Sequence, residues 1–359
     1  MARRTGEAVR PIRLADVAKA AGVSHGTASN VFSRPDVVRD EVRKRVRAAA
    51  EKLGYGGPDP KGRLLRAGKV NAIGVATAEP LSYFFDDPFA RVVMSGISRA
   101  CDATGAGISL VSAANNEQLA WNIQSALVDG FIVFCVEGGS RVVELTRERR
   151  LPFIALDFGF DDHTIAAIGV DDVAGARMAA EHLLELGHRR FAVLSMPFTD
   201  SGAGGPARME QADTASHMGP RDRLVGYFGP LAEAGIDVSR VPIYETRNDE
   251  TTARAALDYF FSRPERPTAI LAMSDTVALH ALDWFRERGI SVPGDVSIVG
   301  FDGVPDGEVS KPSLTSIRQP MVEMGLRAAR AILEFDGAIH REIMPLELVV
   351  RGSTGPVTA

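Results

Sequence analysis

Between residues 24 and 30 the sequence gathers side chains of the kinds that contact nucleic acid. They are Ser24, His25, Gly26, Thr27, Ser29 and Asn30. The three hydroxyls can bond to phosphate oxygens, and the amide of Asn30 matches the N6 and N7 edge of adenine. At the start of a helix such a set faces an anion favourably, because the helix dipole is positive there. The segment therefore predicts contact with a DNA duplex, although Ser24 also suits a purely capping role.

Short helices are needed to position this set. Apolar residues recur at helical spacing in the preceding segment, at Leu14, Val17, Ala18 and Ala21. Gly22 then breaks the pattern, and a second helix is predicted over 25–32. A third helix is predicted over 40–53, ended by Gly54. Two short helices joined by a tight glycine turn and followed by a third describe a helix-turn-helix module.

The charge of the chain is divided unevenly. The 359 residues carry a net charge of -5, yet residues 1–69 hold 16 Lys and Arg against 7 Asp and Glu, which is +9. The remaining residues carry −14. A small basic end joined to an acidic body is typical of nucleic-acid binding by the basic part, although a solvated basic helix would give the same count.

Residues 12–32 resemble the DNA-binding head of the LacI/GalR family of bacterial transcription repressors. The shared pattern runs through Asp16-Val17-Ala18, Ala21-Gly22-Val23-Ser24, Thr27 and Ser29, and it continues through Arg45, Leu53 and Tyr55. Segments of the rest of the chain, including VDGFIVF, RLVGY and VSIVGFDG, also occur in the order of the family. The resemblance implies that the helix beginning near His25 enters the major groove. Many members carry Arg at the position of Asn30, and Gly26 offers the duplex no side chain.

In this family the segment after the head forms a short hinge helix on DNA, and a leucine from it wedges into the minor groove. The family pattern aligns with residues 59–65, which makes Leu65 the wedge and Arg63 its phosphate-binding neighbour. Leu64 is the alternative wedge, since one residue is inserted before it. Gly and Pro punctuate this stretch, as expected of a linker.

From residue 70 onward, short β-rich runs alternate with amphipathic helices. This pattern is typical of parallel sheets covered by helices on both faces, and about 290 residues suffice for two such units. The predicted fold class is α/β, with an N-terminal all-α helix-turn-helix domain joined to a core. The resemblance implies that this core is a two-lobed, periplasmic-binding-protein-like (type I) sandwich.

The expected domains are a head over 1–57, a hinge over 58–69 and an effector-binding and dimerisation core over 70–359. Within the core, one lobe is expected over about 70–168 and 297–320. The other is expected over about 169–296 and 321–350.

Ligands of open α/β sheets bind at the carboxyl ends of the strands. The resemblance and this rule together predict an effector site from six residues: Phe89, Asp157, Arg223, Arg247, Ser274 and Asp302. Arg223 is expected at the start of its helix, where a guanidinium between carboxylates suits sugar hydroxyls or a ligand carboxylate. Structural salt bridges across the cleft are the alternative for Arg223 and Asp302. Asp275 is expected to cap its helix, and Arg247 is either solvated or an added cation that favours an acidic or phosphorylated sugar.

The expected function is transcriptional repression controlled by a small molecule, a sugar or sugar derivative, bound between the lobes. A regulator of the same fold that responds to a nucleobase or nucleoside is the alternative. A solute-binding protein or an enzyme is the competing class, but the sequence carries no phosphate loop and no nucleophile or metalloprotease motif. No cofactor and no metal are expected.

The remaining expectations concern partners and compartment. A homodimer on a pseudo-palindromic operator is expected, because one head buries too little surface for tight specific binding. The dimer interface is expected on the core, and no heptad tail is visible for tetramer formation. Two cysteines, no signal peptide and no apolar run of about 18 residues predict a cytoplasmic protein without a membrane partner.

Overall fold

The computed structural model describes residues 12–57, 69–112, 116–134, 141–156, 163–199, 204–212 and 214–357. The chain divides into two compact units, Met1–Val70 and Asn71–Ala359. The predicted hinge residues Arg63 and Leu65, and the predicted effector residue Asp157, lie outside the described residues.

The first unit is a small helical domain around one apolar core. Its elements are α1 (Leu14–Ala20), α2 (His25–Ser33), the 3-10 turn η1 (Pro35–Val37) and α3 (Asp40–Leu53). The predicted apolar stripe of α1 is buried, together with Ala28 and Val31 of α2 and Val46 and Ala50 of α3. Gly54 ends α3 in the left-handed conformation, at φ 70°. The predicted helix-turn-helix module is therefore confirmed.

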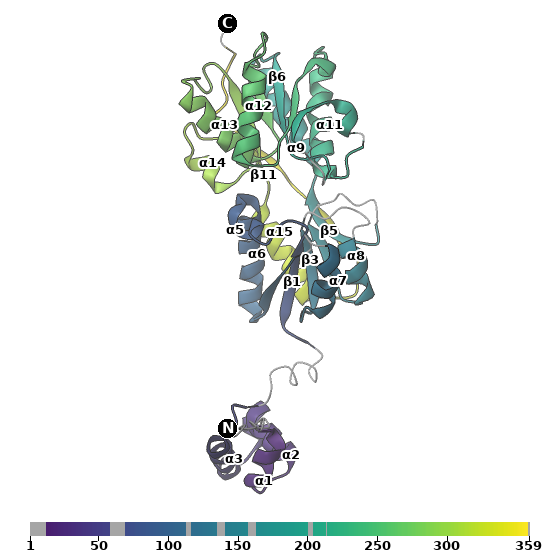
Figure 1. Ribbon diagram of the computed structural model, residues 1–359, viewed down its shortest axis with the longest axis vertical. Coiled ribbons are helices and arrows are strands. Elements are labelled where there is room, and N and C mark those ends of the chain that lie inside the picture. The colour runs from purple at the N-terminus through teal and green to yellow at the C-terminus, as the bar shows by residue number, and fades with distance from the viewer. Residues whose placement is uncertain are drawn as a thin grey trace, which may run out of the picture. The chain divides into compact units, whose positions relative to one another are not determined.

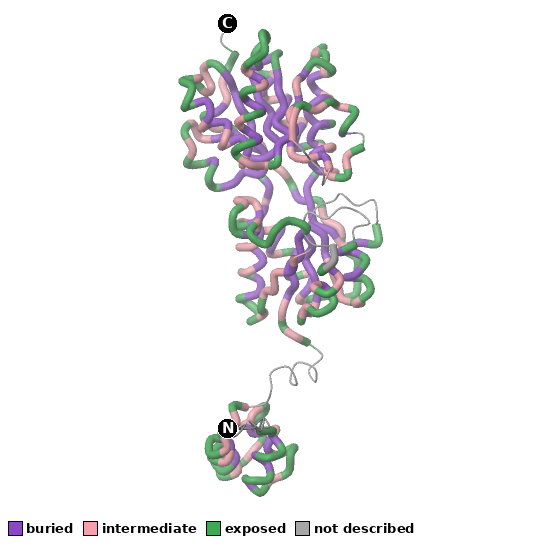
Figure 2. Tube along the Cα trace, viewed as in Figure 1, coloured by how far each residue is buried: buried purple, intermediate pink, exposed green. Residues whose placement is uncertain are grey.

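The second unit contains two largely parallel sheets, each covered by helices on both faces (Figure 1). The first sheet has six strands in the order β12-β5-β4-β3-β1-β2, and all its pairs are parallel. The second has seven strands in the order β13-β11-β10-β9-β6-β8-β7, with antiparallel pairs at its two edges. Figure 2 shows that the central strands form the buried centre of each layer. The predicted α/β fold class is confirmed.

Apolar strand residues drive this layering, since the central strands are buried on both faces. The strands of the six-stranded sheet are β1 (Ala72–Thr77), β2 (Gly107–Ser112), β3 (Gly130–Phe134), β4 (Phe153–Leu156), β5 (Ala166–Val170) and β12 (Arg341–Met344). The helices α5 (Tyr83–Asp86), α6 (Pro88–Thr104) and α15 (Met321–Leu333) share one core with this sheet. The helices α7 (Asn116–Ser125) and α8 (Arg141–Glu148) share the core on its other face.

The seven-stranded sheet is built in the same way. Its strands are β6 (Phe191–Ser195), β7 (Gly205–Ala207), β8 (Ile243–Glu245), β9 (Ala269–Ala272), β10 (Ser297–Asp302), β11 (Thr315–Arg318) and β13 (Glu347–Val349). One face is covered by α9 (Asp172–Glu185) and α11 (Met218–Glu233). The other is covered by α12 (Glu250–Phe261) and α13 (Asp275–Glu287). Short elements complete the layer, namely α10 (Met209–Ala212), η2 (Val238–Arg240) and α14 (Pro305–Val309).

The chain passes between the two sheets three times: after β5, between β11 and α15, and between β12 and β13. This overturns the expected assignment of the C-terminal segments to lobes. Residues 297–320 carry β10 and β11, which pair with the seven-stranded sheet. Residues 321–344 carry α15 and β12, which pack on the six-stranded sheet. The reason is that β10 extends the second sheet beside β9, so the chain returns only after β11.

Helices α9 and α11 approach each other closely because Gly226 lies between them. A Cβ built on Gly226 would lie 2.3 Å from the backbone oxygen of Val173 and 2.7 Å from the Cβ of Ala176. Gly229 lies three residues later in the same helix, and its Cβ would meet only Arg177, at 3.5 Å. This contact matters for function because α9 begins with Asp172 and α11 carries Arg223.

The two glycines give a matched test. We expect Gly226→Ala to lower the free energy of unfolding of the second unit by at least about 1 kcal/mol, because the backbones must separate. Gly229→Ala should change it much less, since the new Cβ meets only Arg177 in other helices, and the helix preference of alanine is offset by its contact with the following Pro230. Urea denaturation of the two variants measures both changes. Equal effects at the two positions would contradict the close packing at Gly226.

Candidate functional site

The turn between α1 and α2 fixes the start of α2. Gly22 adopts a positive φ of 63°, which a residue with a side chain rarely adopts. The Ser24 hydroxyl accepts a hydrogen bond from the backbone N–H of Thr27 at 3.1 Å, and it lies 2.8 Å from the Thr27 hydroxyl. Ser24 is therefore the N-cap of α2, and the first turn of the helix is held in a defined orientation.

The start of α2 presents its polar residues to solvent. Ser24, His25, Gly26 and Asn30 are exposed, whereas Thr27 and Ser29 are half-buried. A Cβ on Gly26 would meet nothing closer than the Ser24 hydroxyl at 3.9 Å. The backbone at Gly26 is thus open to the approach of another molecule.

The first unit also carries exposed basic residues. They are Arg34, Arg39, Lys44, Arg45, Arg47 and Lys52. In contrast, Arg43 pairs with Asp40 in the first turn of α3. A helical unit with exposed cations and an accessible helix start can bind the phosphates of a duplex.

In the second unit, Arg223 is the centre of a buried polar cluster. Its Nε donates to Oδ1 of Asp172 at 2.7 Å, and its Nη1 donates to the backbone oxygen of Met273 and lies 3.9 Å from Oδ1 of Asp302. Its guanidinium carbon also lies 3.7 Å from the ring centroid of Phe301. Although burial lowers the pKa of the Arg223 guanidinium, the carboxylates of Asp172 and Asp302 raise it above its ordinary value.

This arrangement corrects one expectation about Arg223. The residue does not start its helix, because α11 begins at Met218, and the side chain lies inside the fold. The helix continues upstream of the predicted start through Gly219 and Pro220, and a proline is tolerated in a first turn because that turn lacks partners for its N–H groups. Both Asp172 and Asp302 stand at strand ends, Asp172 shortly after β5 and Asp302 as the last residue of β10. The cluster thus gathers at the carboxyl ends of strands of both sheets.

Asp302 links the cluster to the crossing between β11 and α15. Its Oδ1 accepts from Nε2 of Gln319 at 2.9 Å, and its backbone oxygen accepts from the Gln319 N–H at 2.9 Å. Burial raises the pKa of the Asp302 carboxyl well above its ordinary value, and Arg223 opposes this shift. Asp302 has a φ of 122°, in the region that favours glycine, so the surrounding contacts hold it under backbone strain.

Ser274, rather than Asp275, is the N-cap of α13. The Ser274 hydroxyl accepts from the Val277 N–H at 3.3 Å, which corrects the expected role of Asp275. The Asp275 side chain instead turns inward, because it accepts from the Ser316 hydroxyl at 2.6 Å and from the Val304 N–H at 2.7 Å. Burial raises the pKa of Asp275 to about 7.

The structure brings Arg223, Ser274 and Asp302 into one cluster and leaves two expected members apart. Arg247 is exposed, and its Nε donates to Asp249 at 3.2 Å, so it adds no cation to the cluster. Phe89 is half-buried and packs against the core of the six-stranded sheet.

Sequence reasoning missed four members of this region: Asp87, Asp172, Asn248 and Gln319. Asp87 caps α6 through the Ala90 N–H at 2.9 Å, and the Asp-Pro pair at this helix start was an available signal. Asn248 contacts both Asp87 and Ser274. Only the long-range contacts reveal the roles of Asp172 and Gln319, because no local pattern marks them.

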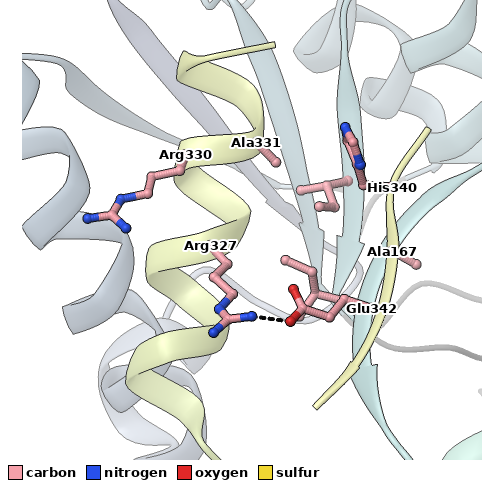
Figure 3. Close-up of a pocket in the computed structure, with 8 residues that line it drawn as sticks. Ala167, Arg327, Arg330, Ala331, His340 and Glu342 are labelled. Atoms are coloured by element: carbon pink, nitrogen blue, oxygen red, sulfur yellow. Dashed lines mark hydrogen bonds and ion pairs between the residues drawn. The ribbon is translucent and has the colours of Figure 1, made fainter. Parts of the chain in front are cut away.

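A separate pocket of about 240 Å³ lies between α15 and the β12 edge of the six-stranded sheet (Figure 3). Arg327 turns to Glu342, which accepts its hydrogen bond, and Arg330 points away from the pocket. The floor is formed by apolar residues such as Ile154 and Ile168. Two of the charged side chains that line the pocket, Arg327 and Glu342, already pair with each other, whereas the Arg223 cluster lies at strand carboxyl ends, where open α/β sheets bind their ligands.

No group of three or more His, Cys, Asp or Glu side chains among the described residues could hold a metal ion. No helix in the described ranges is long and apolar enough to cross a membrane.

Known proteins share both units of this chain. Residues 13–57 match the bacterial regulatory proteins of the lacI family, and residues 180–354 match a periplasmic binding protein-like domain. The HTH-type transcriptional regulator Rv3575c of Mycobacterium tuberculosis is 36% identical over 358 residues, which cover 97% of this chain and 98% of that protein.

Solved structures agree over nearly the full length. The Lac repressor dimer bound to operator and the anti-inducer ONPF is 26% identical, with a TM-score of 0.75, and the match covers 96% of this chain and 100% of that one. The complex of the transcriptional regulator CelR with cellobiose is 25% identical, with a TM-score of 0.68, over 95% of this chain and 99% of that one. The expectation of a regulator rather than an enzyme is confirmed, and the chain belongs to the lacI family of bacterial regulatory proteins as a DNA-binding transcriptional regulator.

Proposed function

We propose that this regulator is a repressor that binds a pseudo-palindromic operator as a homodimer and is controlled by a small polar effector. The exposed start of α2, with a bare backbone at Gly26, carries the DNA-binding part of the proposal. There His25, Gly26 and Asn30 face base edges, while Ser24, Thr27 and Ser29 bond to phosphates. In the expected 58–69 hinge, Leu65 wedges into the minor groove beside Arg63.

The buried cluster around Arg223 carries the effector part of the proposal. Carboxylates, an amide and a hydroxyl meet there at strand carboxyl ends, and Arg223 holds Asp172 and Asp302 in fixed positions. Sugar hydroxyls both donate and accept hydrogen bonds, so they suit such a mixed set. The CelR complex with cellobiose supports a carbohydrate-like ligand at this fold.

The dimer interface belongs on the second unit. Phe85 of α5 and Val309 of α14 are 64% and 80% exposed, which is unusual for large apolar side chains. An ion pair of 3.4 Å between Arg91 and Asp306 joins α6 to α14, so these residues lie on one face. The Lac repressor structure, a dimer on its operator, supports a second copy of the chain as the occupant of this face.

The DNA-binding part is tested by the salt dependence of operator affinity. A duplex selected from a random library by the full-length chain serves as the ligand. With several phosphates contacted per head, the affinity should fall by about 10³-fold to 10⁵-fold between 50 and 200 mM salt. An affinity indifferent to salt would refute phosphate contacts by the basic head.

The effector part is tested by a thermal-shift screen of the full chain with sugars, sugar acids and nucleobases. A true ligand stabilises the folded unit by about 2.7 kcal/mol at a hundred times its dissociation constant. The stabilising compound must then change the operator affinity, in a titration at constant salt. Stabilisation by a nucleobase alone would reject the carbohydrate-like effector, and stabilisation without a change in operator affinity would reject effector control.

A further inference from the structure

Asn248 makes a hydrogen-bonded bridge between the layers of the two sheets. It follows β8 and has a left-handed φ of 57°, and its backbone N–H donates to the Thr246 hydroxyl at 3.3 Å. Its amide oxygen accepts from the Ser274 hydroxyl at 2.5 Å. Its amide nitrogen donates to Oδ2 of Asp87 at 3.5 Å. One side chain therefore contacts residues that are 161 and 26 positions away in the sequence.

The two partners of Asn248 are both helix N-caps. Asp87 caps α6, which packs on the six-stranded sheet, and Ser274 caps α13, which packs on the seven-stranded sheet. Each cap fixes the first turn of its helix, so a bond between the caps fixes the separation of the two layers at this point. The ion pair between Arg91 and Asp306 also joins the layers, but its side chains are 47% and 49% exposed, and such pairs contribute little.

We propose that Asn248 is a latch that sets how far the two sheets open around the Arg223 cluster, and that the effector acts by competing for it. The inference rests on the proposed function, because it assumes that the effector binds in this cluster. An amide fits the position because it must donate to a carboxylate on one side and accept from a hydroxyl on the other. A ligand hydroxyl can make the same two bonds, so a polyhydroxylated ligand can replace the latch and shift the populations of open and closed forms.

The test removes the hydrogen-bond donor of the Asn248 side chain and then restores a donor on the opposite residue. In Asn248→Asp, a carboxylate faces the Asp87 carboxylate, so the bond is replaced by repulsion. We expect the ratio of closed to open forms to fall by about tenfold, as for the loss of one hydrogen bond to a charged group. Combining Asn248→Asp with Asp87→Asn restores a donor and an acceptor with their positions exchanged, and the double variant should recover the closed form.

The opening is measured as a distance distribution between spin labels on the full-length chain. Labels at the exposed positions Ser125 on α7 and Glu265 beyond α12 report on the two layers. Labelled chains are diluted with unlabelled ones so that only distances within one chain contribute. Arg254→Ala is the control, because it removes an ion pair with Glu287 inside one layer, and it should leave the distribution unchanged.

The outcomes separate the latch from the proposed function. A longer label distance in Asn248→Asp that the double variant reverses supports the latch. An unchanged distance in Asn248→Asp overturns it, even if a ligand still controls operator affinity. If Asn248→Asp fails to fold, Asn248→Ala serves instead, and an unchanged distance in that variant has the same consequence. A latch that works in a chain with no effector response would instead overturn the proposed function.

Discussion

Replacing Arg223 by alanine is expected to lower the free energy of unfolding of the second unit by about 3–5 kcal/mol, because a buried ion pair loses one partner. The side chain is 9% exposed, and its Nε lies 2.7 Å from Oδ1 of Asp172. Its removal also exposes the face of Phe301 and leaves the Met273 carbonyl without its donor. Urea denaturation at neutral pH measures the change.

Arg177→Ala is the matched control. Arg177 lies on α9 and pairs with Glu233 of α11, so it joins the same two helices as the pair of Arg223 and Asp172. Its side chain is 41% exposed, and pairs between exposed side chains contribute little to stability because water screens them. If Arg177→Ala and Arg223→Ala destabilise the protein equally, the burial of the Arg223 cluster is not the source of its stability.

The pH dependence of the stability loss in Arg223→Ala distinguishes the loss of a charge from the loss of packing. Burial already raises the pKa values of Asp172 and Asp302, and the loss of Arg223 must raise them further. A carboxyl with a raised pKa in the folded state destabilises the fold above that pKa and ceases to do so as the pH falls through it. The penalty in Arg223→Ala should therefore shrink as the pH falls from 8 towards 5. A penalty that stays constant over this range would indicate a cavity alone.

Arg223 should also be needed for the effector response. Arg223 forms an ion pair with Asp302, and Asp302 accepts a hydrogen bond from Gln319, where the chain crosses from β11 to α15. The Arg223 cluster is therefore connected directly to a segment that joins the two sheets. We expect Arg223→Lys to retain more of the fold than Arg223→Ala and still to lose effector binding, because lysine cannot reproduce the planar fork. Calorimetry with the stabilising ligand measures this loss.

The helical head could be predicted from the sequence because its signals are local. Gly22 and Ser24 mark the end of one helix and the cap of the next within three residues, and the apolar stripe of α1 has a helical period. The parallel sheets could be predicted because apolar runs of strand length alternate with amphipathic helices in the sequence. Such patterns reveal the period and the ends of individual helices and strands, because both depend on residues that are close in the sequence.

The assignment of segments to sheets could not be predicted in the same way. The sequence of β10 is equally suited to either sheet, and only its pairing with β9 places it in the second. The same limit applies to the site. Arg223 was found from its type, but its partner Asp172 lies 51 residues away and Met273 lies 50 residues away. Asn248 was overlooked in favour of Arg247, because spacing alone does not tell which of two neighbours turns inward.

Asn30→Arg is expected to change which base the head prefers at one position of the operator. Asn30 is exposed on α2, one turn beyond Gly26, on the surface proposed to face the bases. An asparagine amide pairs with N6 and N7 of adenine, whereas arginine pairs with O6 and N7 of guanine. Each such pair discriminates by about 1–3 kcal/mol, so the preferred base pair should change from A·T to G·C at that position and nowhere else.

The bare backbone at Gly26 explains how the shorter side chain can reach its base. Asparagine needs a closer helix than arginine does, and no Cβ stands between Gly26 and an approaching surface. Gly26→Ala should therefore weaken operator binding by wild type more than by the Asn30→Arg variant, although alanine favours the helix by about 1 kcal/mol. Selection of half-sites from a random library measures the preferred base, and titration of the operator with each chain at one salt concentration measures the affinity. If wild type and Asn30→Arg enrich the same sequences, Asn30 does not read a base, and specificity must come from His25, the hinge and the shape of the DNA.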